Sequence, residues 1–390
     1  MFSQRTAWPR RVNALAARAA ALLDCGAPIL DLTESNPTRA GLRAPPSILE
    51  LLADLRGLAY DPVPPGSPPA RAAVAADFAR RGAAVGEDRI VLTASTSEAY
   101  GLLFKLLCDP GDRVLAPQPS YPLFDYLAGL ESVALDPYPL AYDGEWHLSV
   151  DALEERLTAR TRAVVVVHPN NPTGSFLKRD EADALLDLCA RRRLALLSDE
   201  VFCDYGRRED PRRHGSLAAR DEALVFALGG LSKSCALPQL KLGWIAMAGP
   251  AALRQEAWER LEIVADTYLS VSTPVQGAAP QILARKEEMQ RPVRARLAAN
   301  LRALEAAFPK GGAAELLRCE GGWSAVLQVP STSSDEEWVD SLLVEQGVLV
   351  HPGYFFEFPR PGFLVLSLLP EEPVFGEALP RLAAHLRAHA

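Results

Sequence analysis

The sequence predicts an α/β protein with a mainly parallel sheet covered by helices and a smaller α+β domain beside it. From about Pro45 to Ser270, short apolar segments alternate with alanine- and leucine-rich helical stretches. The strand segments are apolar throughout, which is typical of a sheet buried on both faces. After Ser270 the pattern changes to a long helical stretch followed by shorter strands. A chain of 390 residues is long enough for two domains.

Six segments of the large domain read as strands, because each is a short apolar run between turn residues or helices. These are Arg89–Thr93, Arg113–Ala116, Ala163–Val167, Leu194–Leu197, Leu224–Leu228 and Leu242–Met247. The helical stretches that separate them include Ser97–Leu107, Ala182–Arg192 and Ala251–Val264. In folds of this kind, ligands bind beyond the carboxyl ends of the strands. We therefore expect the functional site at that edge of the sheet.

The last third of the chain predicts a smaller domain. Residues 274–307 read as long helix, with Pro292 expected to start a second segment because proline suits a first helical turn. Strands are expected at Ser324–Val329 and Phe363–Leu368, and a terminal helix from about Phe375. We expect three parts: an N-terminal segment, 1–45, that packs with the small domain, a large ligand-binding domain, 46–270, and a small C-terminal domain, 271–390.

Composition and charge narrow the class of protein. The net charge of −8 argues against nucleic acid or an anionic membrane surface as the main partner. No apolar run is long enough to span a membrane, so we expect a cytoplasmic protein. The six cysteines and six histidines are dispersed without metal-ligand spacing. We therefore expect buried free thiols and no metal site.

Lys233 is the first candidate for catalysis. It ends the segment Gly230-Leu231-Ser232-Lys233, which follows the apolar run 223–228. A lysine just past a buried strand can lose part of its charge by desolvation and become a nucleophile toward a carbonyl group. The alternative is an ordinary solvated surface lysine.

Two loops that follow strands carry further candidates. Ser95, Thr96 and Ser97 lie where a strand passes into a helix, so their backbone N–H groups could bind a phosphate at the helix N-terminus. The alternative is simple N-capping by Ser95 or Ser97. In Pro117–Pro122, Tyr121 could stack on a flat ring or simply pack against the prolines.

Three polar side chains complete the set of candidates. Asn171 ends a buried strand in the turn Asn170-Asn171-Pro172 and could bind a ring oxygen, or merely form the turn. Asp199 ends another apolar strand, where a charged carboxylate would need a cationic partner such as a protonated pyridine nitrogen, or could cap a helix. Lys241, eight residues after Lys233, supplies a second cation.

The order of these motifs resembles a known family. Tyr60 with Pro65-Gly66 comes first, followed by five motifs: T-x-S-T-S-E (93–98), P-x-P-x-Y-P (117–122), N-N-P-T-G (170–174), S-D-E-V (198–201) and S-K (232–233) with its following cation. Together they resemble the class I/II aminotransferases, which are pyridoxal-phosphate enzymes of fold type I. The similarity extends from Asp31 to Leu368, nearly the whole chain.

The resemblance implies a role for each residue. Lys233 would hold pyridoxal 5′-phosphate as an aldimine and move the proton during transfer through pyridoxamine phosphate. Asp199 would pair with the pyridinium, Asn171 would bind the ring hydroxyl and Tyr121 would stack on the ring. The phosphate would be held by Ser95, Thr96, Ser97, Ser232 and Lys241. Tyr60 would reach in from the second subunit of a homodimer, and Asn36 would border the substrate, an amino donor or a 2-oxo acid.

Four positions depart from the family pattern. Phe202 stands where a tyrosine usually bonds the ring oxygen, Lys241 where an arginine holds the phosphate, and Gly230 where a serine is common. Val365 stands where related enzymes place an arginine that clamps the substrate carboxylate. Candidates to replace that arginine are Arg39, Arg43 and Arg360.

These departures leave alternatives open beside an aminotransferase. The missing arginine leaves room for a lyase or decarboxylase of the same fold. A cofactor-binding regulator without turnover is a further alternative, although the chain has no added basic DNA-binding segment before Asp31.

Overall fold

The computed structural model describes residues 1–10 and 13–389, and its large sheet has eight strands in the order β2-β9-β8-β7-β6-β3-β4-β5. Strand β3 pairs in parallel with β4 and β6, and β6–β7 and β7–β8 are also parallel. Strand β9 is antiparallel to both β2 and β8. The strands are β2 (Ile90–Thr93), β3 (Arg113–Gln118), β4 (Ala134–Tyr142), β5 (Trp146–Leu148), β6 (Thr161–Val167), β7 (Ala195–Asp199), β8 (Val225–Gly230) and β9 (Gly243–Ala248).

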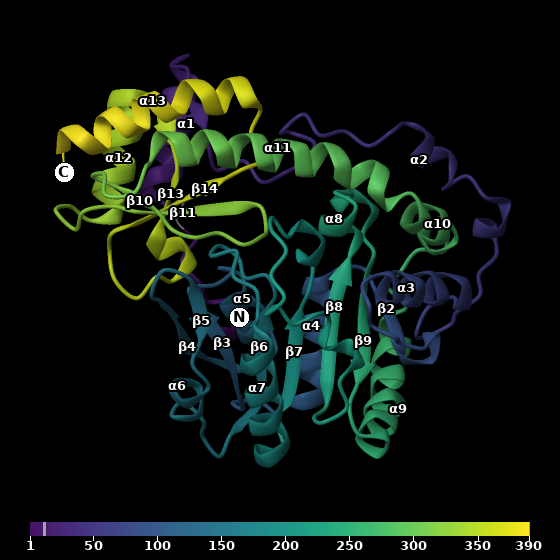
Figure 1. Cartoon of the computed structure of the whole chain (residues 1–390). Coiled ribbons are helices and arrows are strands. Elements are labelled where there is room, and N and C mark those ends of the chain that lie inside the picture. Colours follow the sequence, from purple (N-terminus) through teal and green to yellow (C-terminus); the bar gives the residue numbers. More distant parts are fainter. Residues whose placement is uncertain (11–12, 390) are drawn as a thin grey trace.

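Helices cover both faces of this sheet (Figure 1). Successive strand residues alternate between the faces. Val165 and Leu197 therefore pack with helices α4, α5 and α9, while Val164 and Leu196 pack with α7. The helices of this part are α2 (Ser47–Glu50), α3 (Pro68–Arg80), α4 (Thr96–Leu107), α5 (Phe124–Leu130), α6 (Val150–Glu154), α7 (Arg179–Arg192), α8 (Leu231–Ser234) and α9 (Ala251–Tyr268).

A second sheet, with strands in the order β10-β11-β14-β13, lies with α11, α12 and α13 at one end of the molecule (Figure 1). The N-terminal helix α1 (Ala14–Asp24) joins this part through an ion pair between Arg18 and Asp340 at 2.7 Å. Strand β1 (Leu30–Asp31) pairs with β12 (Val348–Leu349). The remaining elements are α10 (Thr273–Ala284), α11 (Lys286–Ala307), β10 (Glu315–Leu316), β11 (Ser324–Gln328), α12 (Asp335–Gln346), β13 (His351–Pro352), β14 (Phe363–Ser367) and α13 (Glu372–His389).

The six expected strands are present, with bounds that differ by at most two residues, but β4 and β5 were not predicted. Strand β4 carries Asp136, Pro137 and Pro139 and is mostly half-buried, so it lacks an apolar run. The expected helix break at Pro292 was wrong. The break lies at Arg285, and Pro292 lies inside α11, where it removes only one backbone hydrogen bond. The three-part division at residues 45 and 270 stays a prediction.

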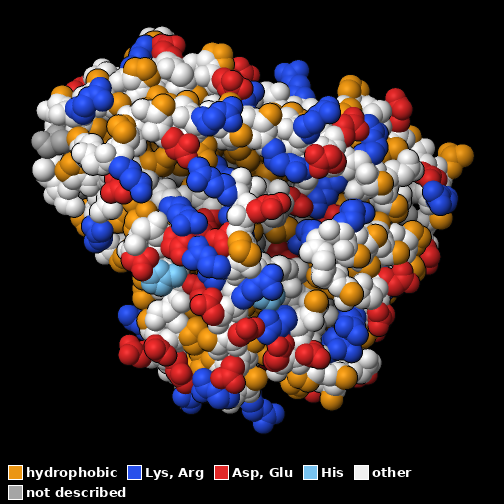
Figure 2. Space-filling model, in the orientation of Figure 1, with side chains coloured by type: hydrophobic (Ala, Val, Ile, Leu, Met, Phe, Trp, Pro, Cys, Tyr) orange, Lys and Arg blue, Asp and Glu red, His pale blue; other side chains and the backbone are white. Residues whose placement is uncertain are grey.

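Two expectations drawn from composition can be compared with the structure. Among the residues described, no helix is long and apolar enough to cross a membrane. The six cysteines are free, but only Cys189 and Cys235 are buried, and Cys25 is exposed. The expectation of uniformly buried thiols was therefore wrong. Basic and acidic side chains are interspersed over the face shown in Figure 2.

Candidate active site

The sheet register brings the expected loops to one edge. Gly243, the first residue of β9, is the partner of Thr93 at the end of β2 and of Gly230 at the end of β8. Asp199 at the end of β7 pairs with Val167 of β6 and Leu228 of β8. The segments that follow β2, β6, β7 and β8, and the segment that precedes β9, therefore start from neighbouring points of the same edge.

Lys233 lies in α8, a single turn directly after β8. Its amine lies 4.8 Å from the ring centroid of Trp323 and 5.5 Å from that of Phe202. Burial lowers the pKa of this lysine, and the negative charge of Asp199 opposes that effect. The Tyr205 hydroxyl donates to the Lys233 carbonyl at 2.7 Å, which fixes the backbone from which the amine extends. The surroundings are those of a desolvated nucleophile rather than a solvated surface lysine.

Asp199 is the buried carboxyl of the site. Its Oδ2 accepts from the Tyr100 hydroxyl at 3.0 Å, and its Oδ1 accepts from the Val201 N–H at 3.2 Å. Burial raises its pKa to about 6, although both hydrogen bonds and the charge of Lys233 act in the opposite direction. A bound cation would favour the ionised carboxylate here.

The turn that holds Asp199 is anchored by the next residue, Glu200. The Glu200 carboxylate accepts from the Ser198 hydroxyl at 3.1 Å and the Leu217 N–H at 3.0 Å, and pairs with Arg81 at 3.2 Å. Arg81 in turn lies 3.5 Å from Asp77. These contacts reach from β7 to α3, so they fix the direction in which Asp199 leaves the sheet.

The loop between β2 and α4 contains Ser95, Thr96 and Ser97. Ser95 is the N-cap of α4, and its hydroxyl accepts from the Glu98 N–H at 3.1 Å. The capping alternative is therefore correct for the Ser95 side chain. A Cβ atom on Gly243 would lie 3.1 Å from the Thr96 nitrogen and 2.9 Å from the Ser95 carbonyl carbon. This close approach places the start of α4 directly against the start of β9.

Lys241 and Ser232 approach this loop from β9 and β8. Lys241 is exposed, adopts the left-handed conformation with φ 50°, and lies two residues before Gly243. Ser232 is half-buried and lies two residues after Gly230. Because Gly230 and Gly243 are paired, the two side chains come from adjacent strand ends. Together with the N-terminus of α4, they offer donors and a positive charge suited to a phosphate.

Tyr121 and Asn171 lie on the loops after β3 and β6. Burial raises the pKa of Tyr121, and the charge of Asp199 raises it further. The Tyr121 ring meets Phe124 edge-on, with centroids 6.1 Å apart. Asn171 is half-buried, and its Oδ1 accepts from the Ser324 hydroxyl at 3.2 Å. That acceptance leaves the Asn171 amide N–H groups as its donors toward a ligand.

Tyr60 and Asn36 have no described contact with Lys233 or Asp199. Tyr60 is 80 % exposed and lines a hollow with Leu92 and Tyr268. Asn36 is exposed, and its Oδ1 accepts from the Thr38 N–H at 3.0 Å. Their roles stay predictions.

Val365 is buried within an apolar cluster. The other members of this cluster are Trp146, Leu317, Val326, Phe356, Phe358 and Phe363. The cluster reaches the loop of Tyr121, because the Phe356 carbonyl accepts from the Ser120 N–H at 2.9 Å. The position at which the resemblance leads us to expect a carboxylate-binding arginine is therefore occupied by a packed side chain without charge.

The three replacement arginines have different surroundings. Arg39 lies 3.8 Å from Glu34, and Arg43 lines a hollow beside Cys235. The Arg360 guanidinium lies 4.9 Å from the Phe363 ring, at the edge of the apolar cluster. Of the three, only Arg360 contacts this cluster.

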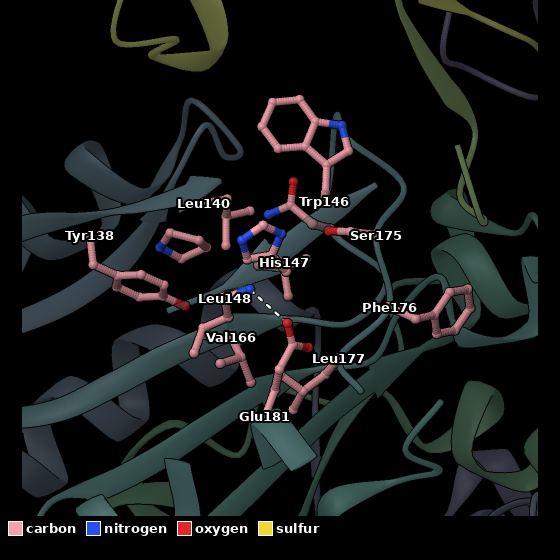
Figure 3. A pocket seen from close by; sticks show the side chains of 13 residues that line it. Tyr138, Leu140, Trp146, His147, Leu148, Val166, Ser175, Phe176, Leu177 and Glu181 are labelled. Atoms are coloured by element: carbon pink, nitrogen blue, oxygen red, sulfur yellow. Dashed lines mark hydrogen bonds between the residues drawn. The ribbon is translucent and has the colours of Figure 1, made fainter. Parts of the chain in front are cut away.

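A third hollow lies beside the Asn170 loop and is shown in Figure 3. Tyr138, Trp146, His147 and Glu181 are among its lining residues. The Glu181 carboxylate accepts from the Leu148 N–H at 2.8 Å and from the Lys178 N–H at the start of α7. Because these bonds tie α7 to β5, we read this hollow as part of the packing between them.

Two aromatic residues of the site were missed from the sequence. Tyr100 bonds Asp199 from the second turn of α4, and Trp323 lies over the Lys233 amine. In the sequence, Tyr100 reads only as an apolar position of a helix. The one available signal for Trp323 was Gly321-Gly322 before it, a pair that allows a close backbone approach.

The donor set fits pyridoxal phosphate. Asp199 is a buried carboxyl that would be ionised by a protonated ring nitrogen, and Lys233 is a desolvated amine that can bond an aldehyde. The start of α4 with Lys241 suits the phosphate. Each group comes from a different strand end, at the edge where α/β sheets bind ligands.

Comparisons with known proteins indicate the family of this chain. The family model described as aminotransferase class I and II matches residues 27–374. An alanine aminotransferase of Mycobacterium tuberculosis is 28% identical over 322 residues, covering 77% of this chain and 71% of the relative. A glutamate-pyruvate aminotransferase of Escherichia coli is 24% identical over 388 residues, covering 93% and 92%. The structure of an alanine aminotransferase from Pyrococcus furiosus superposes with a TM-score of 0.90 at 23% identity, covering 100% of both chains.

Proposed function

The chain belongs to the class I and II aminotransferases, and from this premise we propose which of its residues carry out an amino-group transfer that depends on pyridoxal phosphate. The bound cofactor supplies an electron sink for the bonds at the carbon that carries the amino group. Lys233 binds it covalently and then takes and returns the proton at that carbon. The observation that supports this assignment is the Lys233 amine beside the Phe202 and Trp323 rings, where burial lowers its pKa and the charge of the buried Asp199 opposes that effect.

The remaining residues hold and orient the cofactor. Asp199 pairs with the ring nitrogen and keeps it protonated, while Tyr100 holds the carboxylate in place. Asn171 donates to the ring hydroxyl, and Tyr121 packs against the ring. The phosphate is bound by the backbone at Ser95, Thr96 and Ser97, by Ser232 and by Lys241.

Replacing Lys233 tests the central assignment. Lys233→Ala removes the nucleophile and the proton carrier, so the visible absorption band of lysine-bound cofactor and the transfer of amino groups should both disappear. The control variant Lys310→Ala removes an exposed lysine and should leave the absorption band and the transfer of amino groups unchanged. Amino-group transfer at the wild-type rate in Lys233→Ala would refute the mechanism.

The substrate proposal follows from Val365. A bidentate arginine–carboxylate pair is among the strongest charge-assisted contacts in proteins, and β14 supplies no such fork here. The site therefore discriminates little between amino donors that carry a carboxylate on the reacting carbon and donors that lack it. Arg360 accounts for the small remaining preference for a carboxylate, because its guanidinium borders the cluster around Val365.

Paired donors measure this discrimination. L-Phenylalanine and phenethylamine differ only in the carboxylate, and we expect their half-reaction rates to differ by less than about tenfold. A buried ion pair would instead give about a hundredfold or more. L-Alanine and L-glutamate, suggested by the names of the relatives, serve as reference donors with pyruvate as acceptor. A donor that loses its amino group without converting the cofactor to pyridoxamine phosphate would favour a lyase.

A homodimer is the proposed assembly. Leu55, Leu58 and Tyr60 lie within six residues and are 80%, 85% and 80% exposed. Such a group of apolar side chains is suited to contact with a second copy of the chain. Analytical ultracentrifugation should give a dimer, and Leu58→Glu should shift it toward the monomer and weaken cofactor binding through loss of the partner subunit's Tyr60. A monomeric wild-type protein would contradict the proposal.

A further inference from the structure

The last turns of α12 and α13 bring together three potential metal ligands far from the active site. Glu345 lies on α12, and His385 and His389 lie on α13. One ligand atom from each residue lies within 4.8 Å of the other two. The two histidines are four residues apart on one helix face, with ring centroids 4.3 Å apart. Figure 1 shows α12 and α13 together at the end of the molecule away from the large sheet.

The hydrogen bonds of His385 define which of its nitrogens is free. Its Nε2 lies 2.9 Å from the Ser341 hydroxyl, and this hydroxyl donates its only proton to the Trp338 carbonyl at 3.2 Å. With the Ser341 proton directed at Trp338, the hydroxyl accepts from His385, and in this tautomer the ring proton lies on Nε2. The Nδ1 atom is left with a lone pair. It is buried without a hydrogen-bond partner and lies 3.5 Å from Glu345 Oε2.

His389 is oriented in the same way. Its Nδ1 lies 2.9 Å from the His385 carbonyl, which can only accept, so Nδ1 carries the proton. Nε2 is the nitrogen that remains for a ligand. Each histidine thus donates one ring N–H to a neighbouring oxygen, from Ser341 or from the His385 carbonyl, and keeps the other nitrogen unprotonated, as metal-binding histidines do.

No hydrogen-bond donor is described between His385 Nδ1 and the Glu345 carboxylate. The buried Nδ1 lone pair of His385 meets the Glu345 carboxylate without a donor between them, which is unfavourable unless a cation joins them. The bond of Nε2 to Ser341 already uses the proton of the neutral ring.

We propose that Glu345, His385 and His389 bind one divalent cation of the zinc, nickel or copper class. Imidazole nitrogen suits these ions, whereas magnesium and calcium prefer oxygen ligands alone. Two nitrogens and one carboxylate leave room for a water molecule in a tetrahedral zinc site. The metal cross-links the end of α12 to the end of α13 and thereby stabilises the small domain. This proposal departs from the expectation from sequence that no metal site is present.

Titration of the untagged full-length protein, first treated with a chelator, tests the site. Zinc chloride should bind at one site by calorimetry and raise the melting temperature, and Co²⁺ should give the visible bands of a tetrahedral complex. Glu345→Gln and His389→Gln replace exposed ligands and should remove the Co²⁺ bands. Ser341→Ala removes the acceptor that orients His385 and should weaken zinc binding by about tenfold.

Glu336→Gln is the matched control, because it changes an exposed carboxylate on α12 outside the cluster. It should bind zinc and Co²⁺ as the wild type does. Absence of zinc binding in the wild type would overturn the proposal. Equal binding in the wild type, Glu345→Gln and His389→Gln would overturn it as well, by placing the metal at another site.

Discussion

The Tyr100 hydroxyl donates to Asp199 Oδ2 at 3.0 Å, so a residue in the second turn of α4 holds the buried carboxyl at the end of β7. This bond crosses between two segments that are 99 positions apart in the chain. It favours the ionised form of a carboxyl that burial would otherwise keep protonated.

Removal of this bond should weaken the site. In Tyr100→Phe, Asp199 loses a donor worth about 1.5–3 kcal/mol to a charged group, so its pKa should rise further and cofactor affinity should fall by about tenfold or more. Spectroscopic titration with pyridoxal phosphate measures the affinity. Tyr138→Phe is the control, because it also removes a buried tyrosine bond, here to the Val165 carbonyl at 2.8 Å. An equal loss of affinity in both variants would show a general structural effect instead.

Asp199 should make the cofactor-free protein less stable as the pH rises. Its pKa is about 6 in the folded protein and 3.8 in the reference state. Because the folded carboxyl binds its proton more tightly, the free energy of unfolding should fall as the pH rises through that window, by about 3 kcal/mol in total. In Asp199→Asn this fall should disappear, and the cofactor-free variant should be more stable than the wild type at pH values above the window.

Urea denaturation at a series of pH values measures this effect. Asp151→Asn replaces an exposed carboxyl and should keep the wild-type pH dependence. The same Asp199→Asn variant should bind pyridoxal phosphate more weakly, because the ring nitrogen loses its anionic partner. If cofactor-free Asp199→Asn were less stable than the wild type at every pH, the ionised Asp199 carboxylate would not destabilise the folded protein, and the prediction would be wrong.

Lys241 should act on the phosphate alone. Lys241→Ala removes a charge-assisted contact worth about 1.5–3 kcal/mol, so the affinity for pyridoxal phosphate should fall about ten- to a hundredfold. Affinity for pyridoxal, which lacks the phosphate, should stay the same. Fluorescence titration with both compounds measures the difference, with Lys310→Ala as the exposed control. If both affinities fell together, Lys241 would act on the ring or on folding.

Gly243 should be intolerant of a side chain. A Cβ atom there would lie 2.9 Å from Thr93 Oγ1 and from the Ser95 carbonyl carbon. Gly243→Ala should therefore displace the start of α4 and weaken cofactor binding. In Gly277→Ala, within α10, the added Cβ meets nothing within 4 Å. That control should gain stability, by about 0.5–1 kcal/mol, because alanine favours a helix. Thermal melts and cofactor titrations of both variants distinguish the two effects.

The sequence by itself determined the class of fold, because buried parallel strands need unbroken apolar runs that can be read directly. It also singled out Lys233, Asp199 and Asn171 as candidates, since each lies within five residues after such a run, and their roles stay predictions. Half-buried β4 carries no such run, so its place in the sheet could not be predicted.

Only the tertiary structure decided which distant side chains meet. Tyr100 and Trp323 read as apolar positions, and their contacts with Asp199 and Lys233 depend on how α4 and the small domain pack on the sheet. Glu345 and the two histidines lie 40 or more positions apart across two helices, and no spacing rule links them. Local patterns fix what a segment forms, whereas contacts between segments depend on packing, which no local pattern encodes.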